Sequence, residues 1–331
     1  MIKRYGLVTL FLAVLVLFTS SCGNAVTTTS FSSSSSAPSS FTIAYQPGLS
    51  SLTLVVLKQQ KTLEKQFPHT DFQWKVVNSG ASVRDAMIAN QAQLGNLGLP
   101  PFLVGWDHGF DWKVLATANR ADIWLVAKDP RLKSLKDFTP NDKIGVVAPD
   151  AQQAILLRKA AQNQLGNAHA LDHNLVSIAS ADGEQALLDG QLAAHYSGAP
   201  FQNREVAAGG HIILHSKDAF GPVGTGLIVQ RESFYNQYPD FSEKLYQDIN
   251  AATAFAKTHH DQTAQYLSQD QGGGGTPAQF QALLDDPSFV FDTTPSGLVS
   301  YATFMRSIGL ISKAPGSVKD LELPTVYGIG S

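Results

Sequence analysis

The sequence predicts an α/β protein of two lobes, each built on a mostly parallel β-sheet that carries helices on both faces. Short runs of alternating or continuous apolar residues are typical of strands, and helical patterns follow most of them. This alternation occurs twice along the chain, which indicates two sheets. After Arg231 the sequence is almost entirely helical in pattern, so a helical tail is expected.

The first lobe begins with a strand in which apolar residues alternate with small or polar ones. Its strands are expected at residues 41–45, 72–76, 94–97, 113–117 and 121–128. A first helix is expected over residues 50–66. The next begins near Ser82, where Asp85 has the spacing of a capping box. A third begins at Pro101, since proline suits the first turn of a helix.

The second lobe repeats this order of elements. Strands are expected at residues 143–147, 175–178, 192–196 and 211–214, with helices over 151–165 and 182–190 and another after residues 198–200. A last strand is expected at residues 224–229. We therefore divide the folded part into a first lobe of residues 41–127 and 223–331 and a second lobe of residues 128–222. Residues 123–128 and 223–229 would cross between them as a double hinge.

The N-terminal 21 residues resemble a lipoprotein export signal. Lys3 and Arg4 precede an apolar run over residues 7–18, which is too short to span a membrane. Small residues then lead to Cys22, the only cysteine, as in a bacterial lipobox. Cys22 is therefore expected to carry a lipid anchor that holds the protein on the outer face of the cell membrane. Residues 22–40 are rich in Ser and Thr and are expected to be a disordered tether.

Composition and motifs exclude several classes of function. The formal net charge is −3 and no basic stripe is present, so nucleic acid is not an expected partner. The chain has no His-Glu-x-x-His pattern, no Gly-x-Ser-x-Gly elbow and no Walker loop. His195 is expected to be a satisfied, partly buried histidine. We expect no catalytic residue, no metal and no cofactor, and the protein is not expected to be an enzyme.

Small-residue turns at the carboxyl ends of strands form the candidate binding site. In open α/β sheets the crevice outside these ends binds ligands, and free N–H groups at helix starts can hold an anion. Five such turns, three from the first lobe and two from the second, would face one cleft. The residues expected to contact a ligand are Tyr45, Gln46, Ser50, Ser79, Gly80, Ala81, Leu99, Pro100, Asp150, Ala151, Gln152 and Tyr196.

These turns contain neither Arg nor Lys. A carboxylate ligand is usually held by the guanidinium of an arginine, so this pattern favours a sulfonate or a neutral ligand. Arg120 is the nearest basic candidate and is interpreted as a surface charge. Asp150 is interpreted as a helix cap. Tyr45, Leu49, Leu99 and Tyr196 could supply an apolar wall.

Four segments resemble the solute-binding proteins of ABC importers for aliphatic sulfonates, taurine, nitrate and thiamine precursors. They are residues 41–48 (FTIAYQPG), 77–101 (VNSGASVRDAMIANQAQLGNLGLPP), 122–160 (beginning DIWLVAKDP and including KSLKDF and KIGV) and 304–321 (FMRSIGLISKAPGSVKDL). The resemblance covers most of residues 41–321. It implies the type II periplasmic-binding-protein fold, whose two lobes close on a solute. Residues 148–151 (APDA) depart from the Gly and Ser that family members often carry there, so the ligand could differ from the common ones.

The resemblance also implies the partners. They are a small-molecule solute and the permease and ATPase subunits of an ABC importer. One chain would hold a complete site, so a monomer is expected. Two alternatives remain open at this point, a pyrimidine-synthase-like enzyme on the same scaffold and a ligand-sensing ectodomain. A pyrimidine precursor of thiamine is the alternative ligand to a sulfonate, taurine or nitrate.

Overall fold

The structure is a computed structural model. It describes residues 37–329 apart from positions 78, 221–223, 225, 271–274, 288 and 328. The expected signal, the lipidation site Cys22 and most of the expected tether therefore lie outside the described residues. So do Asn78 of one predicted turn and Val223 at the start of the second expected hinge segment.

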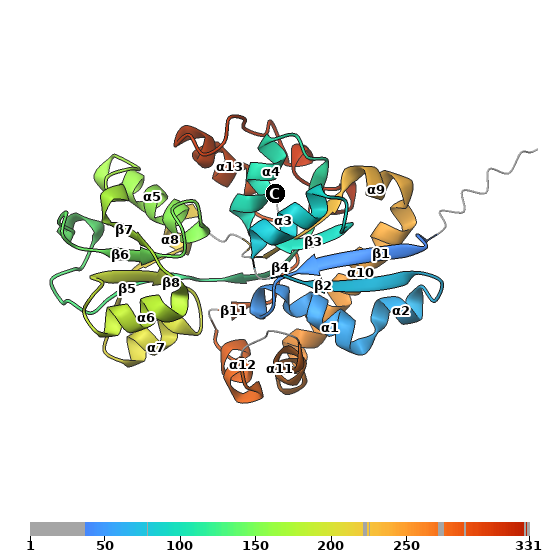
Figure 1. The fold of residues 1–331 in the computed structure, drawn as a ribbon, viewed down its shortest axis with the longest axis horizontal. Helices are drawn as coiled ribbons and strands as arrows, with labels where there is room; N and C mark the ends of the chain where they lie inside the picture. The colour runs from blue at the N-terminus through green and yellow to red at the C-terminus, as the bar shows by residue number, and fades with distance from the viewer. Residues whose placement is uncertain are drawn as a thin grey trace, which may run out of the picture. The chain divides into compact units, whose positions relative to one another are not determined.

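The first sheet lies in the half of the molecule that carries both ends of the described chain (Figure 1). Its strand order is β11-β4-β10-β3-β1-β2. The strands are β1 (Ser40–Tyr45), β2 (Asp71–Val76), β3 (Leu94–Leu97), β4 (Trp112–Ala121), β10 (Gly226–Arg231) and β11 (Phe289–Val290). β1 runs parallel to β2 and β3, whereas β10 is antiparallel to β3 and β4.

The second sheet has the strand order β7-β6-β8-β5-β9. Its strands are β5 (Trp124–Ala127), β6 (Ile144–Val146), β7 (Leu175–Ser177), β8 (Ala194–Ser197) and β9 (His211–His215). β6 is parallel to β7 and β8, and β5 is antiparallel to β8 and β9. Below, "first lobe" and "second lobe" mean these two sheets with their helices.

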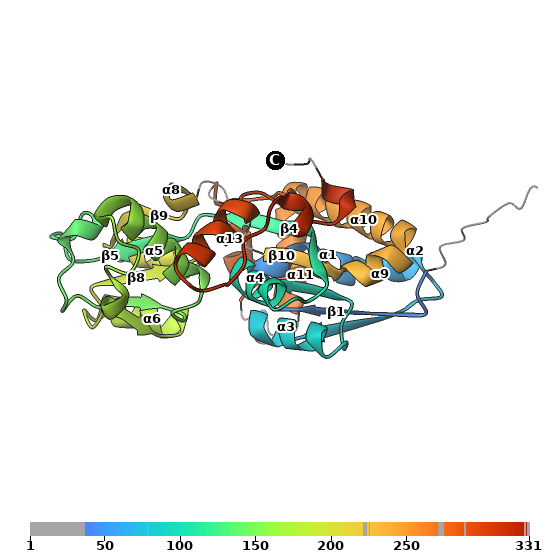
Figure 2. The same ribbon diagram turned by 90° about the horizontal axis from the view of Figure 1, so that it is seen from above.

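Helices cover both faces of each sheet (Figures 1 and 2). Those of the first lobe are α1 (Leu52–Gln60), α2 (Thr62–Gln66), α3 (Gly80–Ile88), α4 (Leu99–Asp107), α9 (Glu232–Gln237), α10 (Pro239–Thr258), α11 (His260–Gln269), α12 (Pro277–Leu284) and α13 (Leu298–Ser307). Those of the second lobe are α5 (Gln152–Leu165), α6 (Ser180–Leu188), α7 (Phe201–Ala207) and α8 (Lys217–Phe220). In the second lobe α5 and α8 lie on the face opposite α6 (Figure 2).

Side chains of β1 alternate between the two faces of the sheet and so contribute to two apolar clusters. Phe41, Ile43 and Tyr45 belong to the apolar cluster with α1 and α10, whereas Ala44 belongs to the cluster with α3 and α4. Successive side chains of a strand point to opposite faces, so this pattern covers both sides of the sheet. The cluster with α3 and α4 also contains residues of α13 and continues into the second lobe, where it includes Tyr196.

The expected fold class is confirmed, and three of its details need correction. The sheets are mixed, because β5 and β10 run antiparallel to their neighbours. β5 belongs to the second sheet, so the first lobe ends between Ala121 and Trp124 and not at residue 127. The tether ends before residue 40, since Pro38 is buried and its carbonyl accepts a hydrogen bond from Thr70 Oγ1 at 2.7 Å.

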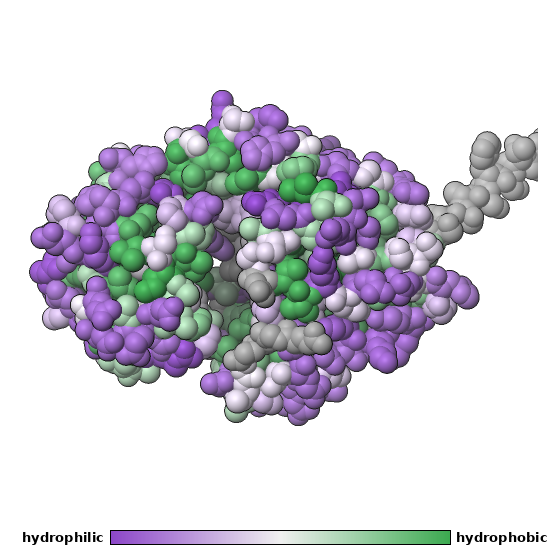
Figure 3. Space-filling model, viewed as in Figure 1, coloured by the Kyte–Doolittle hydropathy of each residue, from purple (hydrophilic) through white to green (hydrophobic). Residues whose placement is uncertain are grey.

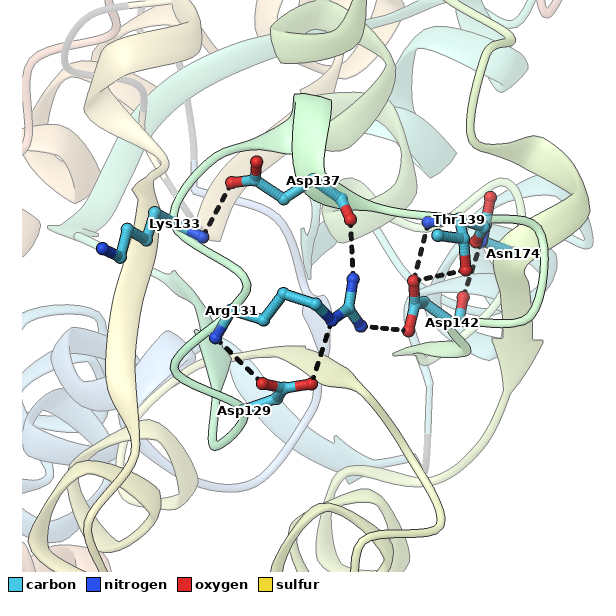
Figure 4. A network of polar contacts seen from close by, with 7 residues as sticks. All are labelled: Asp129, Arg131, Lys133, Asp137, Thr139, Asp142 and Asn174. Atoms are coloured by element: carbon cyan, nitrogen blue, oxygen red, sulfur yellow. Dashed lines mark hydrogen bonds and ion pairs between the residues drawn. The ribbon is translucent and has the colours of Figure 1, made fainter.

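The segment that joins β5 to β6 is held by polar contacts of Arg131 (Figure 4). Arg131 donates from Nη1 to the Asp137 carbonyl at 2.9 Å and from Nη2 to Asp142 Oδ1 at 2.8 Å. The hydrogen bond to Asp142 raises the pKa of Arg131 above its usual value. Ser134 and Asp137 form a capping box around a turn that buries Leu135. The KSLKDF motif therefore fixes this connection.

One buried carboxyl gives a prediction about pH. Glu322 is 4% exposed beside β4, and burial raises its pKa from 4.5 to about 7. A raised folded-state pKa means that this group's stabilising contribution is complete below pH 4.5 and is lost as the pH rises through about 7. We expect Glu322→Gln to raise the unfolding free energy by about 2 kcal/mol at pH 8 and to change it little at pH 4.5.

Denaturant unfolding at the two pH values checks this expectation. Glu243→Gln is the matched control, because Glu243 is exposed on α10. Equal effects of Glu322→Gln at both pH values would contradict the assignment.

Candidate functional site

The first helix turn of α3 supplies backbone N–H groups at the carboxyl end of β2. Ser79 is its N-cap and accepts a hydrogen bond from Ser82 N at 3.1 Å. The predicted cap at Ser82 is therefore wrong by three residues, and Gly80 and Ala81 lie within the helix. The first turn contains no acidic side chain. The remaining N–H groups and the helix dipole make this turn suited to an anion.

Three of the predicted first-lobe turns meet at Gly80. A Cβ added there would lie 3.2 Å from Pro101 Cγ, 3.5 Å from Gln46 Nε2 and 3.6 Å from Leu97 Cβ. Gln46, the start of α3 and the start of α4 are therefore neighbours, as the sequence predicted. Leu99 and Pro100 lie in the first turn of α4 and are buried, so they contribute backbone and core contacts.

The loop after β1 is fixed by polar contacts to β3 and β4 and by a close approach of β10. Ser51 Oγ donates to Asn96 Oδ1 at 2.6 Å, and Asn119 Nδ2 donates to the Leu49 carbonyl at 2.8 Å. A Cβ at Gly226 would lie 2.6 Å from the Ser50 carbonyl oxygen, so only glycine permits this approach of β10. These contacts hold Ser50 at the edge of the sheet.

From the second lobe, the sequence predicts a contribution by the start of α5. Its N-cap is Ala151, whose side chain makes no capping hydrogen bond, so the interpretation of Asp150 as a cap is wrong. Asp150 is exposed, and Ala151 and Gln152 are partly exposed. Arg158 holds the preceding turn by donating from Nη1 to the Pro149 carbonyl at 2.6 Å.

Two predicted wall residues lie in the cores. The Tyr45 side chain is fully buried, and its hydroxyl donates to Asp270 Oδ1 at 2.7 Å and accepts from Lys58 Nζ at 2.7 Å. Tyr196 is also fully buried, on the α5 and α8 side of the second sheet, and its hydroxyl has no hydrogen-bond partner. Neither side chain presents exposed surface in this arrangement.

A pocket of about 580 Å³ lies between the lobes. Leu49 and Ser50 line it from the first lobe, and Phe201 and Arg204 from the second. The remaining lining residues are Pro47, Gly48, Ala181, Ala199, Pro200, Gly275, Gln279, Phe280 and Leu283. Figure 3 shows the surface hollowed between the two lobes, with apolar side chains beside the hollow. The volume is in the range of small-molecule sites.

Sequence reasoning missed the helical part of this lining. Phe201 and Arg204 lie in α7, and Gln279 and Phe280 lie in α12. Attention to the turns alone left them out, although α7 follows the predicted turn at residues 198–200. The guanidinium of Arg204 lies 5.1 Å from the Phe201 ring centre and pairs with Glu184, with Nε–Oε1 at 2.7 Å. This pairing leaves the pocket wall without net charge.

Arg120 is not the surface charge that was expected. It lies in β4 and pairs with Asp292, so its charge is neutralised on the first lobe.

The polar groups inside the second lobe form a buried pair. His195 Nδ1 lies 2.6 Å from Glu205 Oε1, and both side chains are fully buried. Ser197 Oγ donates to the same carboxylate at 3.2 Å. Within the described parts of the chain, no group of three His, Cys, Asp or Glu side chains is placed to hold a metal ion.

Comparison with known proteins identifies the family. The NMT1-like family matches residues 34–269. The chain belongs to this family. It is also 22% identical over 240 residues to an Escherichia coli (strain K12) protein named for binding aliphatic sulfonates, covering 72% of this chain and 73% of that protein.

Solved structures of periplasmic binding proteins share the fold of this NMT1-like protein. The E. coli aliphatic sulphonate binding protein SsuA superposes with a TM-score of 0.73 at 19% identity, covering 88% of this chain and 99% of that one. The alkanesulfonate-binding protein SsuA of Xanthomonas axonopodis pv. citri, bound to MOPS, gives 0.68 at 19% identity, covering 86% and 98%. The nitrate-binding protein NrtA of Synechocystis PCC 6803 gives 0.68 at 13% identity, covering 86% of each chain. The α/β two-sheet architecture is thereby that of the periplasmic binding proteins.

No helix in the described ranges combines the length and the apolar character that crossing a membrane requires.

Proposed function

We propose that this protein is the extracytoplasmic solute-binding subunit of an ABC importer and captures a small sulfonate between its lobes. The observation that carries the proposal is the pocket of about 580 Å³, to which both lobes contribute. A site divided between two lobes is suited to capture by closure, because a ligand that contacts both sides stabilises the closed arrangement. The sulfonate-binding and nitrate-binding relatives support the same class of solute.

The chain passes between the lobes twice, which fits a hinge. The first crossing is Asp122–Ile123, between β4 and β5. The second lies between the end of α8 at Phe220 and the start of β10 at Gly226. Rotation at a few such residues would move one lobe relative to the other while each sheet stays intact.

The anionic head of the ligand is assigned to the start of α3. This turn offers free N–H groups and has no acidic side chain, whereas Asp150 lies exposed just before α5. The start of α4 has prolines at positions 100 and 101, which lack N–H groups. Leu49, Phe201 and the other apolar lining residues would then face the organic part of the solute, which favours a sulfonate over nitrate.

The remaining features of the proposal concern the membrane and the partners. Cys22 would carry the lipid anchor after removal of residues 1–21, and the Ser-rich tether would give the lobes reach toward a permease and its ATPase. One chain holds a pocket lined from both lobes, so the binding subunit would act as a monomer.

Thermal unfolding against a panel of solutes tests this function. The panel contains taurine, isethionate, longer alkyl sulfonates, nitrate, bicarbonate, a hydroxymethylpyrimidine and simple amino acids. A solute at about 100 times its Kd adds about 2.7 kcal/mol to the unfolding free energy, which is a clear shift. We expect stabilisation by at least one sulfonate. Stabilisation by nitrate or the pyrimidine alone, or by none of the panel, would reject the sulfonate assignment.

A further inference from the structure

A hydrogen bond joins the two lobes beside the candidate pocket. Asn203, in α7 of the second lobe, donates from Nδ2 to Asp286 Oδ2 at 2.8 Å, and Asp286 follows α12 of the first lobe. Both residues are half-buried, and the amide oxygen of Asn203 is covered from solvent. A hydrogen bond to a carboxylate is stronger than one between neutral groups, and shielding from water preserves its strength. This contact is therefore suited to holding the lobes together.

The two helices that carry this contact also supply walls of the pocket. Phe201 and Arg204 stand on either side of Asn203 in the sequence of α7, and both line the pocket. Leu283 of α12 lines it from the first lobe and precedes Asp286 by three residues. Neither Asn203 nor Asp286 lines the pocket itself. The hydrogen bond therefore fixes the spacing of the two walls without entering the space that a solute would fill.

Buried polar contacts fix α7 on the second lobe and on the hinge. The Gln202 side chain donates from Nε2 to the Asp122 carbonyl at 2.8 Å and accepts from Trp124 N at 2.9 Å. Asp122 belongs to the first crossing between the lobes. Glu205, three residues further along α7, is fully buried and bonded to a side chain of β8. Asn203 is therefore held on an element that moves with the second lobe as a unit.

We propose that the hydrogen bond between Asn203 and Asp286 is a latch that holds the lobes closed on the solute. This inference rests on the proposed function, in which closure of the lobes captures the solute. Asn203 and Asp286 are then positioning residues, which act on the solute through the walls formed by α7 and α12. Because neither side chain lines the pocket, the latch stabilises the closed arrangement equally for every solute. It slows release of the solute and does not select among solutes.

Asn203→Asp tests the latch by placing a second carboxylate opposite Asp286. At pH 8 we expect repulsion between like charges to replace the hydrogen bond. Calorimetric titration with isethionate and with butanesulfonate should show binding of both weakened about tenfold, and stopped-flow measurements should place the change in the dissociation rate. Small-angle X-ray scattering of the variant without ligand should give a larger radius of gyration, because the open arrangement is more populated.

Exchanging the two groups provides the decisive comparison. In Asn203→Asp combined with Asp286→Asn, the amide at position 286 can donate to the carboxylate at position 203, so the contact is rebuilt in the reverse direction. We expect this double variant to bind within about threefold of the unmodified protein and to recover its radius of gyration. Asn203→Ala removes the hydrogen bond without adding charge and should weaken binding by a smaller factor than Asn203→Asp. Asp285→Asn is the control, because Asp285 pairs with His260 of its own lobe.

The outcomes separate the latch from the function. If Asn203→Asp and Asn203→Ala both leave the dissociation rate and the radius of gyration unchanged, or if the exchanged pair restores neither, the latch is overturned and the importer function stands. If Asn203→Asp weakens binding of one sulfonate and not the other, Asn203 contacts the ligand directly and the latch is also overturned. If neither sulfonate binds the unmodified protein, the sulfonate assignment fails, and the radius of gyration of the ligand-free variants alone decides the latch.

Discussion

Lys58→Met is expected to destabilise the protein by about 3 kcal/mol. Lys58 Nζ lies 2.7 Å from Asp270 Oδ1 and 2.7 Å from the Tyr45 hydroxyl oxygen. The Asp270 side chain is fully buried and Lys58 is 24% exposed. Removing the cation leaves a carboxylate in the interior with Tyr45 as its remaining partner among the described contacts. Breaking a buried ion pair in this way typically costs 3–5 kcal/mol, and the partial exposure of Lys58 places the expectation at the lower end.

Denaturant unfolding of matched variants checks this expectation. Lys65→Met removes an exposed lysine from the neighbouring helix α2 and is expected to change stability by less than about 0.5 kcal/mol. Adding Asp270→Asn to Lys58→Met removes the uncompensated charge, so part of the loss should be recovered. If Lys58→Met costs no more than Lys65→Met, the ion pair does not contribute to stability.

This ion pair also positions one side of the candidate site. Tyr45 ends β1 immediately before the loop that contains Leu49 and Ser50, and Asp270 follows α11 a few residues before Gly275. Both segments line the pocket between the lobes. Lys58→Met should therefore weaken ligand binding as well as folding, because in the described part of the chain only the hydrogen bond from Tyr45 to Asp270 then ties the two segments to each other.

The strands were the part of the fold that local sequence pattern could predict. Apolar residues alternate with small or polar ones over residues 41–45, and β1 lies there. The predicted boundary between the lobes was wrong because β5 pairs with β8 and β9, which lie far along the chain. β4 continues through Asn119 and Arg120, since Asn119 reaches the Leu49 carbonyl and Arg120 pairs with Asp292. No local sequence pattern predicts either contact.

The candidate site was likewise predictable from the sequence only in part. The meeting of Gln46 with the starts of α3 and α4 followed from the rule that the carboxyl ends of parallel strands share one edge. The buried state of Tyr45 could have been read from its place in the alternation with Phe41 and Ile43. The contribution of α12 to the pocket wall could not have been predicted, because the approach of α12 to α7 depends on how the lobes are arranged.

Ala81→Glu is expected to weaken sulfonate binding about a hundredfold without loss of stability. Ala81 is exposed in the first turn of α3, where the anionic head of the ligand is placed. Two like unit charges about 5 Å apart repel by roughly 3 kcal/mol at an effective dielectric constant of about 20. This repulsion corresponds to about a hundredfold in Kd. The same carboxylate stabilises the helix start by about 0.3–1 kcal/mol, because it faces the positive end of the helix dipole.

The opposite signs of these two effects make the measurement decisive. Calorimetric titration with isethionate gives the change in Kd, and thermal unfolding without ligand gives the change in stability. Ala81→Gln is the control, since it has the same size and no charge, and is expected to bind within a few-fold of the unmodified protein. Weak binding by both variants would indicate steric blockage at Ala81. Equal binding by Ala81→Glu and the unmodified protein would place the anionic head elsewhere, because a carboxylate in the first turn of α3 repels an anion only if the anion is there.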